Sequence, residues 1–344
     1  MRAVVIHAPR DLRVEEIACD DPGPGEVRVR LGAGGICGSD LHYYLHGGFG
    51  AIRLREPMVL GHEVAGTVAA TGAGVTAVAQ GDRITVNPSV PCGQCAYCRE
   101  GLRNQCLDMR FYGSAMRFPH VQGAFREEIV IAEAQAFPVG DTVTLEEAAC
   151  AEPLSVCLHA VTRAGSLTGK RVLVSGCGPI GCLTIMAARF AGAQEIIAAD
   201  VVAAPLALAT RIGADVAVNA GDDAGLAEYR RDKGRVDVTF ECSGNPRALA
   251  AAVEVTRPQG TIVLVGLGGD VPLPMNMVVA KELQLHGTFR FDAEFAWAAE
   301  LIAGRRIDVR PLVTATLPLD RAREAFDLAA DRSRSMKVQL TLAG

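Results

Sequence analysis

The chain has 344 residues, of which 49% are apolar and 21% are charged, and its formal net charge is −5. This composition predicts a globular protein long enough for two domains. The sequence has no basic stripe for a phosphate backbone and no apolar run long enough to span a membrane, so we expect neither nucleic acid nor a membrane as partner. The charged N-terminal residues do not form a secretory signal, and we expect a cytoplasmic protein.

Residues 1–150 are predicted to form a β domain. Short β segments broken by glycine and proline occur at Arg2–Ile6, Glu26–Leu31, Glu63–Ala69 and Arg83–Asn87. Short strands at irregular spacing are typical of a small barrel.

Four cysteines of this β domain share one loop, with the spacing Cys92-x2-Cys95-x2-Cys98-x7-Cys106. The short spacings let successive backbone turns direct four thiolates at one zinc ion. Disulfides are a poor alternative, because neighbouring C-x2-C pairs would be strained and the total of 11 cysteines is odd. The loop therefore predicts a closed structural zinc site with no position for a substrate.

Residues 151–290 are predicted to alternate strands with helices. The expected strands are Arg171–Ser175, Ile196–Asp200, Val236–Glu241 and Thr261–Val265. The expected helices are Pro179–Ala191, Pro205–Ile212 and Arg247–Thr256. This alternation predicts an α/β domain with a parallel, doubly wound sheet.

A dinucleotide-binding fingerprint stands at the first strand of the second domain. The strand runs into a G-x-G-x-x-G turn and then a helix, with these residues at the turn: Gly176, Gly178, Pro179, Ile180 and Gly181. The glycines allow a tight turn and close approach to a pyrophosphate, which the helix N-terminus attracts. Asp200 ends the second strand, where the fingerprint places an acid for the ribose hydroxyls. Since no Arg or Lys in Val201–Leu206 could neutralise a 2′-phosphate, we predict NAD in preference to NADP.

Residues 291–344 are predicted to return to the first domain. The expected elements are a helix at Ala293–Ala303, a helix near Arg321–Ala329 and a strand at Lys337–Leu342.

A second set of potential metal ligands is scattered along the first 152 residues: Cys37, His62, Glu63 and Glu152. Taken singly, each has an ordinary interpretation as a buried thiol, a core histidine or a surface charge. Periodicity alone cannot bring them together.

Five motifs nevertheless resemble, in order, the zinc-dependent medium-chain dehydrogenase/reductase family. They are the Cys37 motif, Gly61-His62-Glu63, the four-cysteine loop, Glu152-Pro153 and the dinucleotide fingerprint. The resemblance implies a GroES-like β-barrel catalytic domain, a Rossmann coenzyme domain, and one catalytic and one structural zinc ion per chain. It implies that Cys37 and His62 bind the catalytic zinc and that Glu63 or Glu152 completes its shell, directly or through water. The fourth position is kept for water or the substrate oxygen.

Within this family the motifs resemble the polyol dehydrogenase branch. Residues 104–120 and 287–291 are similar to those of bacterial L-idonate 5-dehydrogenases. By this resemblance, the reaction is the reversible oxidation of L-idonate to 5-keto-D-gluconate. Two alternatives stay open: a dehydrogenase of threonine or a neutral polyol (sorbitol, xylitol or galactitol), and a non-catalytic protein that keeps zinc or cofactor.

The resemblance also implies individual roles. The Ser39 hydroxyl, the cofactor ribose and His42 form a proton relay to solvent, while Glu63 and Glu152 serve the catalytic zinc. The cofactor is further contacted by Val265, Gly266, Leu267, Phe289 and Arg290. A sugar-acid carboxylate needs a cation, and the candidate substrate residues are Tyr43, Arg110, Phe111, Arg117, His120 and Arg290. Family members are typically homotetramers or dimers.

Overall fold

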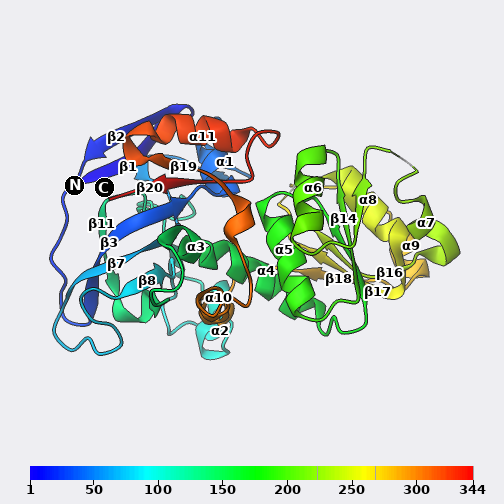
Figure 1. Cartoon of the computed structure of the whole chain (residues 1–344), viewed down its shortest axis with the longest axis horizontal. Coiled ribbons are helices and arrows are strands. Elements are labelled where there is room, and N and C mark those ends of the chain that lie inside the picture. Colours follow the sequence, from blue (N-terminus) through cyan, green and yellow to red (C-terminus); the bar gives the residue numbers. More distant parts are fainter. Residues whose placement is uncertain (223, 268, 344) are drawn as a thin grey trace. The chain divides into compact units, whose positions relative to one another are not determined.

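The computed structural model describes residues 1–222, 224–267 and 269–343. It divides into two compact units (Figure 1): Met1–Glu152 with Phe295–Gly344, and Pro153–Glu294. We call them unit 1 and unit 2. The chain passes between them at residues 152 and 294, where the sequence analysis placed boundaries at 150 and 290.

Unit 1 is built mainly from strands. They are β1 (Arg2–Ala8), β2 (Asp11–Glu16), β3 (Glu26–Gly35), β4 (Gly48–Phe49), β5 (Ile52–Arg53), β6 (Met58–Val59), β7 (Glu63–Thr71), β8 (Arg83–Val86), β9 (Ser89–Val90), β10 (Arg110–Phe111), β11 (Glu128–Ala132), β12 (Ala136–Pro138), β19 (Val313–Pro318) and β20 (Lys337–Thr341). The largest sheet has the order β12-β8-β7-β3-β20-β19, and β11 also pairs with β3.

Strand β3 lies in the interior of this sheet, where it pairs with β7, β20 and β11. Buried residues alternate with more exposed ones along most of its length. Its inward side chains Val27, Val29 and Leu31 belong to one hydrophobic core with Ile84 and Phe125. Strand β20 lies between β3 and β19, so two strands from the C-terminal segment complete a sheet whose other strands come from the N-terminal part of the chain (Figure 1).

The helices of unit 1 are short. They are α1 (Gly38–His46), α2 (Ala96–Arg99), α3 (Leu145–Ala149) and α11 (Ala322–Ala330). Two further helices, α4 (Ala151–Ala164) and α10 (Glu294–Ala303), contain the points at which the chain passes between the units.

Unit 2 contains six parallel strands and the helices that connect them. The strands are β13 (Arg171–Ser175), β14 (Glu195–Asp200), β15 (Val216–Asn219), β16 (Val236–Glu241), β17 (Thr256–Leu264) and β18 (Gln284–Gly287). The helices are α5 (Pro179–Phe190), α6 (Ala203–Arg211), α7 (Ala227–Arg230), α8 (Pro246–Val255) and α9 (Met275–Ala280). The strand order is β15-β14-β13-β16-β17-β18. Because the order reverses between β13 and β16, right-handed crossovers place α5 and α6 on one face and α8 and α9 on the other (Figure 1).

The predicted α/β class, a β domain with a doubly wound parallel-sheet domain, agrees with the strand orders of the two units. Short strands such as β11, β15 and β18 were not predicted, because their one to four apolar residues give little periodic signal. Strand β17 begins at Thr256, earlier than the predicted Thr261. Within the described residues, no helix is long and apolar enough to cross a membrane.

Candidate active site and cofactor sites

The first cluster of metal-binding side chains forms where β3 ends and β7 begins. Gly35 pairs with Glu63 in the antiparallel register of these strands, so the residues just beyond each strand meet. Cys37 follows β3 as the N-cap of α1, and His62 directly precedes β7. The ligand atoms of Cys37, His62 and Glu63 all lie within 4.8 Å of one another. We call these three residues the Cys37 centre.

The strand pairing at the Cys37 centre depends on a glycine. A Cβ atom added to Gly35 would lie 2.1 Å from the Glu63 carboxylate, so no larger residue fits there without displacing Glu63.

Asp40 joins the two segments that carry Cys37 and His62. Its fully buried carboxylate accepts hydrogen bonds from the backbone N–H groups of Cys37 (3.0 Å) and Gly61 (3.1 Å). Burial raises the pKa of Asp40, and His62, whose Nδ1 lies 3.9 Å from Oδ1, opposes that rise. The sequence analysis missed this residue, although an acid three positions after an N-cap is a recognisable capping pattern.

Glu63 is paired with a buried lysine from the C-terminal segment. Nζ of Lys337 lies 2.8 and 2.7 Å from the two Glu63 oxygens and 3.3 Å from the Ile36 carbonyl oxygen. The two side chains are only 3% and 2% exposed. Burial acts to lower the pKa of Lys337, but the Glu63 carboxylate outweighs it and raises that pKa. The sequence analysis missed Lys337, because nothing local links it to a residue 274 positions earlier.

Glu152 stands at the start of α4 and is also buried. Burial raises the pKa of its carboxyl to about 8, and the electrostatic attraction of His62 acts against that rise. Among the described residues, the ligand atoms that lie within 4.8 Å of one another at this place belong to Cys37, His62 and Glu63, and Glu152 is not in that group. Burial also raises the pKa of the Cys37 thiol, to about 12, with the negative charge of Glu63 contributing.

The donor set of the Cys37 centre fits zinc. A thiol, an imidazole and a carboxylate are ordinary zinc ligands, and three protein ligands leave one position open for chemistry. The buried Nδ1 of His62 has no hydrogen-bond partner among the described residues, so the imidazole keeps capacity to bind a metal.

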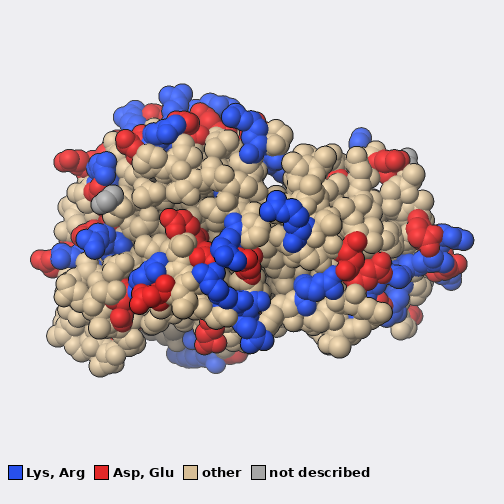
Figure 2. Space-filling model, viewed as in Figure 1, with Lys and Arg blue, Asp and Glu red and all other residues tan. Residues whose placement is uncertain are grey.

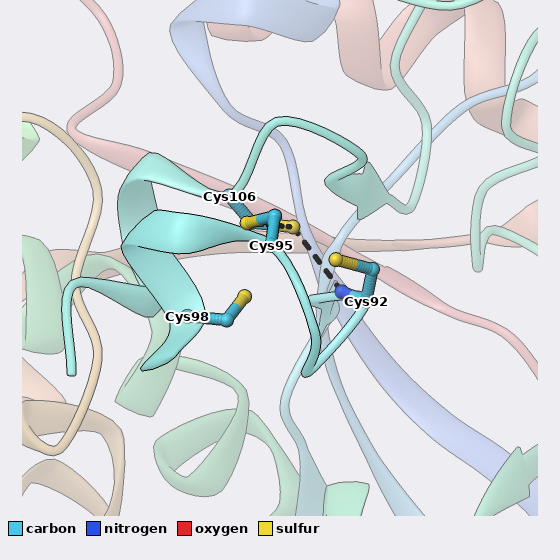
Figure 3. Close-up of side chains that lie close together, drawn as sticks. All are labelled: Cys92, Cys95, Cys98 and Cys106. Carbon is cyan, nitrogen blue, oxygen red and sulfur yellow. Dashed lines mark hydrogen bonds between the residues drawn. The ribbon is translucent and has the colours of Figure 1, made fainter. Parts of the chain in front are cut away.

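The four cysteines of the loop form the second cluster (Figure 3). Cys92, Cys95, Cys98 and Cys106 have ligand atoms within 4.8 Å of one another, and their sulfurs face a common space. Cys95 caps the short helix α2, while the backbone N–H of Cys92 donates to the Cys106 sulfur at 3.2 Å. Hydrogen bonds from the backbone N–H groups of Leu107 and Cys98 lower the pKa of Cys95 to about 6. Four thiol donors fit a closed tetrahedral zinc site.

The proton-relay residues lie on helix α1. Ser39 is half-buried in its first turn, and His42 is exposed one turn further along. Burial lowers the pKa of His42, and His46 on the next turn lowers it further.

The predicted substrate residues of unit 1 lie in different environments. Phe111 is buried and its ring stands 5.3 Å from that of His62, beside the Cys37 centre. Arg110, the preceding residue on β10, is exposed. Tyr43 is buried, and its hydroxyl accepts a hydrogen bond from the backbone N–H of Ala115.

Arg117 and His120 are occupied by local partners. Arg117 is ion-paired with Asp108 and donates to the Leu107 carbonyl oxygen. The buried His120 lies with Nδ1 2.7 Å from the Arg117 carbonyl oxygen, and its Nε2 accepts from the backbone N–H of Arg55 at 2.9 Å. His120 thus has both ring nitrogens engaged in holding this loop.

In unit 2, the glycine-rich turn has the geometry that a dinucleotide site requires. Gly176 has a φ of 90°, and a Cβ on Gly181 would lie 1.8 Å from the Gly176 carbonyl oxygen. Gly178 is the N-cap of α5 and Pro179 its first residue, which leaves the first N–H groups of the helix facing the turn. The start of α5 and the close-packed glycines of the turn therefore leave room for a pyrophosphate.

Asp200 lies at the end of β14 with its carboxylate buried. It accepts hydrogen bonds from the backbone N–H groups of Cys177 (2.7 Å) and Val202 (3.0 Å), which ties the acid to the glycine-rich turn. An ionised carboxylate accepts hydrogen bonds only, which is the role that ribose hydroxyls require.

The remaining predicted cofactor residues of unit 2 follow two neighbouring strands. Val265, Gly266 and Leu267 come directly after β17, and the first two donate backbone hydrogen bonds to the Glu241 carbonyl oxygen. After β18, the guanidinium of Arg290 lies 5.0 Å from the ring centre of Phe289. Arg290 has a φ of 53°, an uncommon value for a non-glycine residue, which is often found at functional sites.

The folds of the two units and the two groups of potential zinc ligands are those of a zinc-binding dehydrogenase. Residues 23–141 match the model of the alcohol dehydrogenase GroES-like domain, and residues 179–304 match that of the zinc-binding dehydrogenase domain.

Whole-chain relatives agree. The chain is 42% identical over 340 residues to L-idonate 5-dehydrogenase (NAD(P)(+)) of Escherichia coli K12, covering 98% of both chains. It is 37% identical to sorbitol dehydrogenase of Gallus gallus, covering 98% of this chain and 95% of the relative. The crystal structure of L-idonate 5-dehydrogenase from Escherichia coli K-12 superimposes with a TM-score of 0.94, covering 99% of this chain and 98% of that one. The chain therefore belongs to the zinc-dependent alcohol dehydrogenase family and is an NAD(P)-dependent oxidoreductase of its polyol branch.

Proposed function

We propose that this enzyme oxidises the secondary alcohol of a sugar acid to a ketone, with L-idonate and 5-keto-D-gluconate as the reversible pair. The Cys37 centre carries the reaction class, because it brings an open set of zinc ligands together from distant parts of the sequence. The 42% identity to L-idonate 5-dehydrogenase over nearly the whole chain supports the substrate.

In this proposal Cys37 and His62 hold a catalytic zinc, and the four-cysteine loop holds a structural one. When bound, the zinc lowers the pKa of a substrate hydroxyl, and the nicotinamide accepts the hydride. Glu63 is ion-paired with Lys337, and Glu152 is buried at the start of α4 with a raised pKa. Comparing the zinc content of E63Q and E152Q identifies which carboxylate binds the ion directly.

The chain's own side chains move the proton. Ser39 receives it near the substrate oxygen, and His42 delivers it to water, since an exposed imidazole exchanges protons readily near neutral pH. Replacing His42 by alanine should slow proton release while leaving the zinc content unchanged.

We propose NAD as the preferred coenzyme. The buried Asp200 carboxylate at the end of β14 can accept from ribose hydroxyls and repels a 2′-phosphate. The name of the Escherichia coli relative includes both coenzymes, so the measurement is direct: kcat/KM with NAD and NADP on one substrate. A higher kcat/KM with NADP would contradict the role given to Asp200.

Arg290 is our candidate for the anchor of the substrate carboxylate. Arg110, which precedes the Phe111 that contacts His62, is the second choice. A guanidinium binds a carboxylate through two parallel hydrogen bonds. The R290Q variant should raise the KM for L-idonate more than that for sorbitol. Equal effects on both substrates would exclude a role as anchor.

A neutral polyol such as sorbitol is the second candidate substrate, favoured by the 37% identity to a sorbitol dehydrogenase. Steady-state rates with L-idonate, 5-keto-D-gluconate, sorbitol, xylitol, galactitol and threonine decide between the substrate classes. Turnover of none of them would revive a non-catalytic binding role. By family resemblance we also propose a cytoplasmic tetramer or dimer of identical chains, which sedimentation of the purified protein would test.

A further inference from the structure

Two histidines stand one turn apart on the outer face of helix α1. His42 and His46 are both exposed, and their ring centres are 6.2 Å apart. Side chains four positions apart in a helix lie one above the other on the same face. This spacing also places the two zinc-binding imidazoles of helical metalloprotease motifs on one face.

The rings of this pair are chemically unoccupied, unlike the other histidines. Of the seven histidines in the chain, four have a ring nitrogen hydrogen-bonded to another residue, namely His7, His120, His159 and His286. A fifth, His62, belongs to the Cys37 centre. Among the described residues, no hydrogen bond is made to the ring of His42 or His46, so both rings keep their nitrogens for a ligand.

Local packing and electrostatics favour a cation at this position. The Phe49 ring lies beside that of His42, with the ring centres 5.6 Å apart. Helix α1 ends at His46, and Gly47 closes it in the left-handed conformation with φ 70°. The last turn of a helix carries a partial negative charge that attracts a positive ion. Burial, together with the nearby His46, lowers the pKa of His42 and so favours the neutral imidazole that metals bind.

We infer that His42 and His46 form an additional metal site that takes a borderline divalent ion, Zn²⁺ or Ni²⁺, through one nitrogen of each ring. Small rotations of the two exposed side chains bring one nitrogen of each to the ion, and water completes its coordination. A bound ion removes the lone pair with which His42 would accept a proton. The site therefore makes the enzyme sensitive to excess metal, an effect that rests on the proton-relay role proposed for His42.

Ni²⁺ binding tests the site independently of activity. The zinc-loaded enzyme, dialysed into metal-free buffer, is titrated with NiCl₂ by calorimetry. We expect one Ni²⁺ site in the unaltered protein and binding at least tenfold weaker in H46Q, which corresponds to about 1.4 kcal/mol. The matched control is H286Q, because the His286 ring of the parent is already hydrogen-bonded to the Arg163 carbonyl oxygen. The Ni²⁺ affinity of H286Q should equal that of the parent. Equal affinities of H46Q and the parent, or no binding by the parent, would overturn the site.

Activity in the presence of metal tests the consequence. H46Q should retain the basal turnover, because His46 is no part of the proposed reaction machinery. Millimolar NiCl₂ or ZnCl₂ should slow the parent and not H46Q, and brief dilution into metal-free buffer should restore the rate. Inhibition that persists in H46Q would show that another site is responsible. Ni²⁺ binding at the pair without inhibition would support the metal site and contradict the relay role of His42.

Discussion

At the scale of single residues, the charge balance of the Cys37 centre depends on a pair of buried ions. Glu63 and Lys337 are almost completely enclosed and make two hydrogen bonds to each other. Taking either partner away leaves the other charge in a poorly solvated place, which costs far more than an exposed ion pair contributes.

Replacing Lys337 by methionine should therefore destabilise unit 1 by about 3–5 kcal/mol, because Glu63 is left buried and unpaired. Denaturant unfolding of the zinc-loaded protein measures the loss. The matched controls are K337R, which keeps the charge, and the double variant E63Q/K337M, which removes both charges. Both should recover much of the stability. A double variant as unstable as K337M alone would show that packing, rather than charge, explains the loss.

Asp40 positions two ligand segments without binding the metal in this proposal. In D40N the carboxamide still accepts one backbone hydrogen bond but loses the charge that faces His62. Since outer partners of metal ligands commonly contribute 10–100-fold in affinity, we expect a zinc affinity lower by about that factor. Competition with a chromogenic chelator measures it. D327N, which alters an exposed acid bonded to Tyr44, should leave zinc affinity unchanged.

The residue scale also shows what sequence can reach. Cys37 and His62 belong to motifs that the sequence displays. Asp40 stands three residues after the N-cap Cys37, a capping pattern that could also have been recognised in the sequence. Lys337 could not be found in this way, because its relation to Glu63 exists only through the pairing of β20 with β3. His120 was a candidate substrate residue by resemblance, and only the structure shows that its ring nitrogens contact backbone groups of its own loop and a neighbouring one.

At the scale of elements, the four-cysteine loop has little apolar support of its own. Helix α2 has no buried residue, and Leu102 and Leu107 are exposed. We therefore propose that a zinc ion, rather than a hydrophobic core, orders this loop.

The C98S variant should thus lose local order around residues 92–106 while unit 2 stays intact. Hydrogen exchange followed by mass spectrometry should show faster exchange in this loop and unchanged protection in β13–β18. C19S, at an exposed cysteine outside the loop, is the control. If exchange in C98S matched that of the parent, the structural role of the metal would be refuted.

A second element-scale contact joins α4 to the start of α10. His159 Nδ1 lies 3.0 Å from Glu294 Oε1. Burial acts to raise the pKa of Glu294, but hydrogen bonds from His159 and from the backbone N–H of Asp292 outweigh it and lower this pKa to about 2. The carboxylate therefore contributes stability fully above its ordinary pKa of 4.5, and this contribution disappears as the pH falls from there towards 2.

E294Q should accordingly lower the free energy of unfolding by about 2 kcal/mol at pH 7, and the difference from the parent should shrink by pH 3. Urea unfolding at both pH values tests this. E324Q, which removes an exposed partner of Arg321, should have no measurable effect at either pH. A difference that stays constant between pH 7 and pH 3 would contradict the depressed pKa.

At the scale of the whole molecule, the net charge is small, −5, and the face shown in Figure 2 carries side chains of both signs. The two-unit architecture could be predicted because the change from β segments to alternating strands and helices is a change of period that the sequence displays. The boundaries lie within helices α4 and α10, whose continuous patterns give no sign of a division. The order of the mixed sheet in unit 1 could not be predicted either, since it depends on pairings between segments hundreds of residues apart.

Because the two units have separate hydrophobic cores, we expect NAD and zinc to affect the stability of different units. NAD at about 100 times its Kd should stabilise unit 2 by about 2.7 kcal/mol, whereas a zinc chelator should destabilise unit 1. Differential scanning calorimetry should resolve two transitions, of which NAD raises one and the chelator lowers the other. A single transition that both treatments shift would mean that the units unfold as one.

The pairing of β20 with β3 has a consequence for synthesis on the ribosome. Unit 2 is one continuous stretch and can fold as soon as it has emerged, because domains generally fold as units while translation proceeds. Unit 1 must wait, with its largest sheet missing two strands and Glu63 lacking its counter-ion, until residues 313–341 have left the exit tunnel. During that interval unit 2 of the nascent chain would be folded while unit 1 would be incomplete, and chaperones would be needed most at this stage.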